Sequence, residues 1–277
     1  MKYFLTICFV IVFNLNKAQT NRYFYELKYK LDSTQAEPWE KIMVLDINPK
    51  EIKYYDNDFL EIDSINKKYN TDNTNWTDQI PVTRKKNSAV NTNFVMIDFQ
   101  AYSFTTEDKI LWKLEKDTKK VENFNLQKAT TRFGGRNWIA WFTKDIPISE
   151  GPYKFNGLPG LIIFLQDDKA NYIFSLIKSK NIHETYDTSN FLEDRYGEKP
   201  IPITERIYVN KKLEYYNDPY HQIREGLRNG TTKSYDDNGI RYTNANDLIP
   251  KIKQQQEYII KHNNPIELTK AINYSKQ

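Results

Sequence analysis

The chain has 277 residues, of which 39% are hydrophobic, 14% aromatic and 27% charged, with a formal net charge of +4. This near-neutral balance argues against a protein that binds nucleic acid through bulk positive charge. The single cysteine, Cys8, lies in an apolar N-terminal run, so the rest of the chain has no disulfide, thiolate nucleophile or cysteine-ligated metal. The aromatic residues, 20 tyrosines among them, favour β-sheet.

The N-terminal segment has the pattern of a secretory signal. One lysine precedes an apolar run over residues 3–13, and Ala18 offers a small residue for cleavage. The run is too short to span a bilayer, although a retained anchor is the alternative interpretation. We therefore expect residues 1–18 to be a cleaved signal peptide and the mature protein to be exported, either periplasmic or secreted. Cleavage removes two lysines and no acidic residue, which lowers the net charge from +4 to +2.

Periodicity predicts a β-rich region over residues 19–182. Strands are predicted at 22–31, 41–47, 51–55, 93–100, 110–115, 124–132, 137–143, 161–165 and 172–178. Phe59, Ile62 and Ile65 recur at helical spacing and predict a short surface helix over 58–69. Residues 70–93 are rich in Asn, Thr, Asp and Lys, which predicts a long mobile loop.

The sequence changes character over residues 183–277. An edge strand is predicted at 204–209, and Asp218 followed by proline predicts the start of a helix that ends near Gly230. A second helix is predicted over 247–262. Residues 19–277 are thus expected to form a single β-rich domain, with the main sheet over 19–182 and a helical C-terminal part.

The most specific stretch is GPYKFNGLPGLIIFL, residues 151–165. Pro159 and Gly160 occupy the positions that a type II turn prefers. The five apolar residues from Leu161 to Leu165 do not alternate with polar ones, which predicts a strand buried on both faces. A strand of that kind needs a layer on each side, and a helix is the expected cover. The predicted fold class is α+β, mainly antiparallel β.

Residues 133–162, FGGRNWIAWFTKDIPISEGPYKFNGLPGLI, resemble the core of the GLPGLI family, exported proteins of Bacteroidota without an established function. The family motif corresponds here to Gly157, Leu158, Pro159, Gly160, Leu161 and Ile162. The resemblance extends to LQKAT at 126–130 and NNPIEL at 263–268. It supplies no catalytic residue. It implies a strongly curved, half-barrel-like sheet covered by helices, similar to periplasmic lipoprotein carriers, and this analogy concerns the fold alone.

Charged residues interrupt the aromatic and apolar motif. They are Arg136, Lys144, Asp145, Glu150 and Lys154. One hypothesis makes them the polar rim of an apolar groove, with a candidate ligand-binding set of Arg136, Trp138, Trp141, Lys154 and Phe155. The other makes them solvent-facing residues of strands whose opposite face is core, and the alternation of the strands favours this second interpretation. Trp138 and Trp141, three residues apart, are expected on opposite faces of the sheet.

No sequence pattern indicates catalysis, a metal or a cofactor. The three histidines lack metal-ligand spacing, and no serine elbow or phosphate-binding glycine loop occurs. The sequence therefore favours a non-catalytic binding or carrier module whose partner is an apolar ligand or a lipidated segment. Two alternatives remain: an accessory protein that docks to an envelope protein through residues 70–93 or the C-terminal helices, and a hydrolase with an unrecognised site.

Overall fold

A computed structural model describes residues 19–235, 239 and 241–274, so the expected signal peptide lies outside the described residues. Twelve strands form one sheet. The strands are β1 Thr20–Tyr29, β2 Trp39–Ile47, β3 Glu51–Asp56, β4 Val82–Lys85, β5 Val90–Ile97, β6 Gln100–Glu107, β7 Lys113–Val121, β8 Phe124–Phe133, β9 Arg136–Thr143, β10 Leu161–Asp167, β11 Tyr172–Ile182 and β12 Ile201–Pro202. The α-helices are α1 Asn57–Tyr69, α2 Glu205–Asn217, α3 His221–Arg228 and α4 Ile249–Lys261. Short helical turns occur at Ser189–Glu193, Arg195–Gly197, Ala245–Leu248 and Leu268–Lys270.

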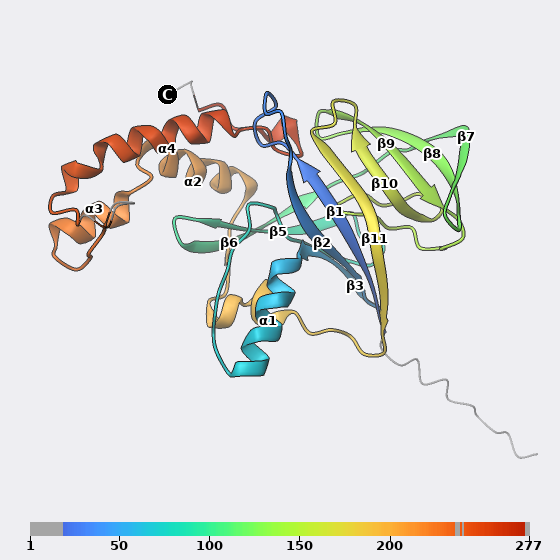
Figure 1. Cartoon of the computed structure of the whole chain (residues 1–277), viewed down its shortest axis with the longest axis horizontal. Helices are drawn as coiled ribbons and strands as arrows, with labels where there is room; N and C mark the ends of the chain where they lie inside the picture. Colours follow the sequence, from blue (N-terminus) through green and yellow to red (C-terminus); the bar gives the residue numbers. More distant parts are fainter. Residues whose placement is uncertain (1–18, 236–238, 240, 275–277) are drawn as a thin grey trace, which may run out of the picture.

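The sheet is open and almost entirely antiparallel (Figure 1). Its order is β12-β6-β5-β4-β3-β2-β1-β11-β10-β9-β8-β7, and the short β12 pairs with β6 in parallel. The N-terminal strand β1 therefore lies in the middle, with β2 on one side and β11 on the other. Two meanders run outward from it, which confirms the expected α+β fold with a mainly antiparallel sheet.

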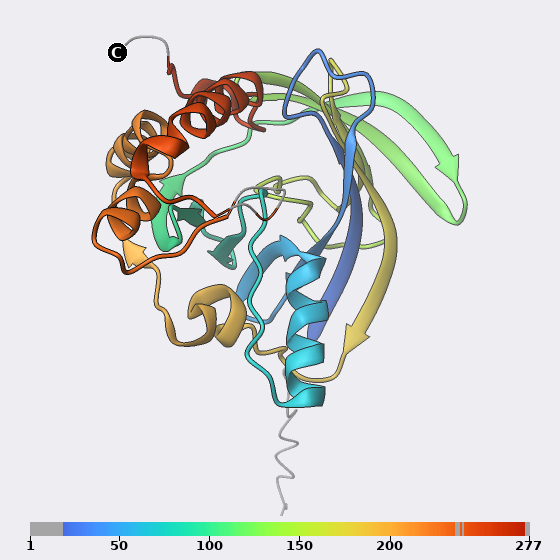
Figure 2. The same cartoon turned by 60° about the vertical axis from the view of Figure 1, so that its left-hand side comes forward.

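The connection from β6 to β7 shows that the sheet must curl. These strands are consecutive in the chain but lie ten strand positions apart in the sheet. Ten spacings in a flat sheet would separate them by about 48 Å. The stretch from Glu107 to Lys113 can reach only about 21 Å when fully extended. The ends of the two strands are therefore brought together by bending, and Figure 2 shows the strands curving around an interior.

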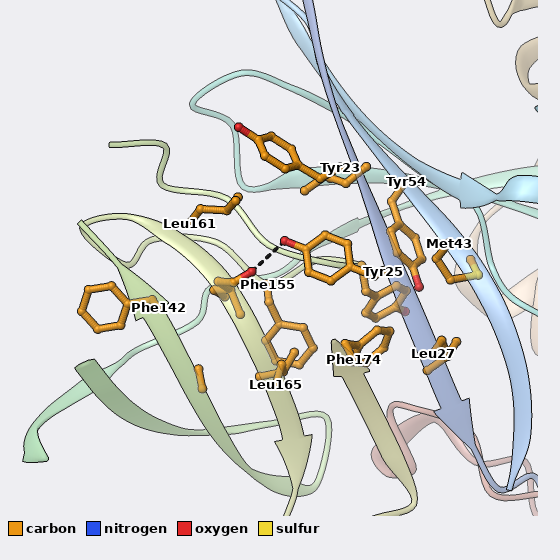
Figure 3. Packing of buried hydrophobic residues seen from close by; sticks show 14 of the residues in the cluster. Tyr23, Tyr25, Leu27, Met43, Tyr54, Phe142, Phe155, Leu161, Leu165 and Phe174 are labelled. Atoms are coloured by element: carbon orange, nitrogen blue, oxygen red, sulfur yellow. Dashed lines mark hydrogen bonds between the residues drawn. The ribbon is translucent and has the colours of Figure 1, made fainter. Parts of the chain in front are cut away.

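Aromatic and aliphatic side chains fill much of this interior. Tyr23, Tyr25, Leu27 and Tyr29 alternate along β1 and are all buried in one large cluster. The segment between β9 and β10 contributes Phe155, which converges with side chains of several strands (Figure 3). Tyr25 Oη donates a 2.7 Å hydrogen bond to the Ile162 carbonyl, so the hydroxyl group of this buried tyrosine has a hydrogen-bond partner.

Several predicted elements agree with the structure, whereas the loop at 70–93 and the strands at 110–115 and 204–209 do not. The strand predicted at 110–115 is β7, which begins only at Lys113. The helix at 58–69 and the strands around the motif are confirmed. The loop predicted at 70–93 is wrong in its second half, because β4 and the start of β5 occupy part of it and bury Val82 and Arg84 in the sheet. The strand predicted at 204–209 is helix α2, which Thr204 caps through its side chain. Strand β6 was not predicted at all.

The bend at Pro159 and Gly160 is not the type II turn that the residue types predicted. The Leu161 N–H donates to Ile146 O at 3.1 Å, and the Gly160 N–H donates to Leu158 O at 2.8 Å. A Cβ placed on Gly160 would lie 1.9 Å from the carbonyl oxygen of Thr143. Glycine is therefore required here by the close approach of two backbone segments.

Strand β10 is covered more completely on one face than on the other. Leu161, Ile162 and Leu165 are fully buried, whereas Ile163 and Phe164 are half-buried. A register shift between Ile162 and Phe164 changes which side chains share a face. The prediction of a strand buried on both faces is therefore wrong for the centre of β10.

Two of the helices pack against the sheet. Helix α1 contacts β2 and β3, and helix α2 contacts β5 and β6.

Candidate functional site

Arg136 joins the sheet to the C-terminal segment. Its side chain, at the start of β9, is 2% exposed, and its Nη1 lies 2.9 Å from Asp167 Oδ2. Nη2 donates to Asn264 Oδ1 and to the Pro265 carbonyl, both at 2.7 Å, while Nε donates to the Ile266 carbonyl at 3.0 Å. The guanidinium thus uses its fork of donors to hold one turn of backbone against the sheet.

Lys154 makes a second buried connection to the same segment. Its side chain is 1% exposed, and Nζ lies 2.7 Å from Glu267 Oε1 and 3.0 Å from Asp108 Oδ2. Tyr153 Oη also donates to Glu267 Oε1 at 2.6 Å. Burial alone would raise the pKa of Asp108, but the Lys154 charge and a hydrogen bond from Thr106 outweigh it and hold that pKa below its usual value.

These contacts join the two separate parts of the family resemblance. The NNPIEL segment, residues 263–268, is bound by Arg136 and Lys154 from the long motif. Glu150 is also buried and pairs with Arg84, and burial raises its pKa despite that arginine. The interpretation of the motif's charges as solvent-facing is therefore wrong for these three residues. It is correct for Lys144 and Asp145, which are exposed.

The aromatic members of the predicted groove lie on both faces of the sheet. Trp138 and Phe155 are buried together, with ring centroids 4.6 Å apart. Trp141 is half-buried on the other face, where the Lys119 ammonium lies 4.1 Å from its ring centroid. This confirms that the two tryptophans face opposite sides. Four of the five predicted groove residues, all except Trp141, are thus buried, and Trp138 and Phe155 belong to the hydrophobic core.

The structure contains a cleft of about 370 Å³ elsewhere, between the C-terminal segment and one end of the sheet. This size is within the range of small-molecule sites. Its lining includes eight aromatic residues, namely Trp39, Trp76, Phe94, Tyr172, Tyr208, Tyr215, Tyr258 and Tyr274. None of the predicted groove residues lines it. Arg136 nevertheless supports it, because Pro265 and Ile266, which Arg136 binds, are in the lining.

Two helices contribute one face each to this cleft. Tyr208, Lys212 and Tyr215 of α2 are spaced four and three residues apart, and Gln255, Ile259 and His262 at the end of α4 follow the same spacing. Such residues share one helix face. No residue of either helix is fully buried. The faces that point into the cleft are therefore incompletely covered.

Stacked rings form one end of the cleft. The His262 ring lies 3.9 Å from that of Tyr258 and 6.0 Å from that of Trp39, in nearly parallel planes. His262 Nδ1 is 2.8 Å from the Tyr258 carbonyl. Asp78 lines the same cleft, and its Oδ2 accepts a 2.6 Å hydrogen bond from Tyr29 Oη. Among the described residues, no hydrogen bond or ion pair joins Asp78 to His262.

Sequence reasoning missed this cleft because its lining comes from separate segments. The signal available was the helical spacing of aromatic and polar residues near the C-terminus, which the predicted strand at 204–209 obscured. Within the part of the chain that the structure describes, no three histidine, cysteine, aspartate or glutamate side chains are grouped as metal ligands. None of the described helices combines the length and apolar composition needed to cross a bilayer.

Comparisons with known proteins agree with this fold and add no activity. No curated protein matches the chain. Two solved structures, of PNGF-II in C2 and in P21 space groups, are similar, with TM-scores of 0.52 and 0.51 and sequence identities of 13% and 12%. The matches cover 70% of this chain but only 32% and 33% of those chains, so they show a shared fold alone. Residues 135–164 match the model of a family described as "Protein of unknown function (Porph_ging)".

Proposed function

We propose that the protein is a non-catalytic binding or carrier module that holds an apolar ligand, or the lipid of a lipidated segment, in the cleft between the C-terminal helices and the sheet. The observation that carries this proposal is the aromatic lining of that cleft together with the incomplete burial of α2 and α4. Protein interiors are normally close-packed, whereas Tyr208, Tyr215 and Ile259 of these helices line the cleft and are only half-buried, so they have apolar surface left for a ligand to cover.

The architecture supports this role. A sheet that curls around an interior, with helices across its open side, would enclose a ligand as a half-barrel carrier does, and we propose this helix-covered arrangement for the ligand-bound protein. The core around Phe155 is already filled by side chains, which leaves the helix-lined end as the place for a ligand. We further propose that the chain is an exported GLPGLI-family protein, so that its ligand is a component of the cell envelope.

Hydrolysis is the alternative, because Asp78 and His262 line the same cleft. General acid–base catalysis would require one of them to contact a nucleophile or water in the cleft. Each is instead bound to a neighbour, Asp78 to Tyr29 and His262 to Tyr258. Catalysis would therefore require Asp78 or His262 to leave its present hydrogen-bond partner. Binding of an apolar ligand requires no such change and is the better supported role.

Tryptophan quenching tests the proposal and locates the ligand at the same time. The protein without residues 1–18 would be delipidated, refolded and titrated with a brominated fatty acid, which quenches tryptophan fluorescence only at short range. Trp39 and Trp76 line the cleft, whereas Trp112, Trp138 and Trp141 do not. We expect saturable quenching in the wild type and its loss in a Trp39→Phe, Trp76→Phe double variant.

The matched control replaces Trp112 and Trp141 with phenylalanine. This variant has the same number of tryptophans as the double variant but keeps both cleft residues, so its quenching should persist. Absence of saturable quenching in the wild type would refute the binding role. Equal quenching in both double variants would place the ligand outside the cleft.

A further inference from the structure

Lys212 is a cation in the cleft that forms no hydrogen bond or ion pair with any described residue. It lies in the middle of α2, one turn after Tyr208 and one turn before Tyr215, and all three residues line the cleft. Its side chain is half-buried, and among the described residues no carboxylate or hydrogen-bond acceptor contacts its ammonium. The neighbouring Lys211, by contrast, forms an ion pair with Glu214 at 2.7 Å.

The other charged groups of the lining are already engaged. Lys270 pairs with Glu205 at 2.9 Å and with Glu267 at 3.2 Å. Asp78 accepts a hydrogen bond from Tyr29. Burial first, and then the charge of Asp78, raise the pKa of Tyr258 and of Tyr29. Burial lowers the pKa of Lys212, and no carboxylate of the described residues raises it again.

An unpaired ammonium in a partly desolvated cleft is unfavourable, and an anion that enters the cleft removes this cost. The aromatic residues that line the cleft with Lys212, among them the stacked rings of Trp39, His262 and Tyr258, provide an apolar surface for the rest of such a molecule. Among the described residues, the cleft thus has one unpaired cation, Lys212, and a lining rich in aromatic side chains, which together complement an anionic amphiphile.

We propose that the ligand is an elongated apolar molecule that ends in a single anionic group, and that Lys212 binds this group. The inference rests on the proposed binding function and specifies its ligand class. A carboxylate and a phosphate monoester share the required chemistry. A charge-assisted hydrogen bond to the Lys212 ammonium would distinguish them both from neutral lipids of the same chain length.

Isothermal titration with three dodecyl compounds tests the proposal. Dodecanoate, dodecyl phosphate and dodecanol have the same apolar chain and differ in the head group. In the wild type we expect at least one of the anions to bind about tenfold or more tightly than dodecanol. In Lys212→Met, which keeps the side-chain length but removes the charge, we expect dodecanol to bind as in the wild type and the preference for the anion to vanish.

Lys211→Met is the matched control. It removes a lysine from the same helix, but this lysine is paired with Glu214. It should keep the preference for anions. Thermal unfolding of Lys212→Met should occur at or above the wild-type temperature, because the variant loses an unpaired charge. Equal affinity for dodecanol and both anions in the wild type, or a preference that survives in Lys212→Met, would overturn the inference and leave the binding function standing. Failure of all three compounds to bind would overturn both.

Discussion

Close packing between backbone segments explains why particular residue types occur in the motif at residues 157–162. Gly160 has no room for a side chain because the chain reverses directly against Thr143, and Gly157 has a φ of 95°, in the region that favours glycine. Leu158 and Leu161, which flank Pro159 and Gly160, are buried in the core. Pro159 and Gly160 could be recognised from the sequence as a bend, but the partner strand that makes glycine necessary could not. The motif is thus a structural element of the fold.

Replacing Gly160 with alanine should destabilise the protein, because the new Cβ would meet the Thr143 carbonyl. We expect a free energy of unfolding lower by about 1–3 kcal/mol than that of a matched Gly230→Ala variant. Gly230 also has a positive φ, of 68°, but no atom lies within 4 Å of a Cβ there. Urea denaturation of both variants measures the difference. Equal stability would contradict the proposed close approach.

Asp108 makes the free energy of unfolding depend on pH in the acidic range. Its folded-state pKa lies below the unfolded value of about 3.9, so its stabilising effect is complete above that pH and is lost as pH falls through the folded pKa. Asp108→Asn should therefore be less stable than the wild type at pH 7, and the difference should shrink below about pH 4. Unfolding free energies at pH 7 and at lower pH provide the test. A difference that stays constant with pH would contradict the assignment.

At the scale of elements, the sequence predicts strand β1 and the helices α3 and α4, but it does not predict helix α2. Strand β1 is recognisable because its apolar residues alternate and all face one core. Helix α2 is not, because its cleft face holds tyrosine and lysine and no residue of it is fully buried, so apolar periodicity is weak. The contact between the long motif and the NNPIEL segment depends on tertiary structure and has no local signal. A binding site built on such elements escapes sequence analysis for the same reason.

The C-terminal segment should depend on Arg136. Arg136→Met would leave Asp167, a fully buried carboxylate, without its charged partner and release the backbone of residues 264–266. We expect a loss of about 3–5 kcal/mol in unfolding free energy and faster amide exchange over 262–272. Arg132→Met is the control, because Arg132 is an exposed residue of the neighbouring strand. Unchanged exchange in Arg136→Met would show that this arginine does not hold the segment.

At the scale of the whole molecule, a short connection sets the shape. The link between β6 and β7 forces the two outer parts of the sheet together, and the C-terminal helices lie beside the β5–β6 part of the sheet, where α2 contacts both strands (Figure 1). A strongly curved sheet was expected only from the family resemblance. No periodicity in the sequence reveals it, because curvature depends on strand order. The cleft exists because the sheet curls and the helices do not fill the space that it leaves.

A crystal structure of the protein with dodecanoate tests the central claim most directly. We predict a continuous ligand in the cleft, with its chain against Trp39, Trp76 and Tyr258 and its carboxylate at Lys212 Nζ. α2 and α4 should then have residues that are fully buried by protein and ligand together. A cleft that stays empty at saturating dodecanoate and also at saturating dodecyl phosphate, or that side chains close completely, would contradict the account.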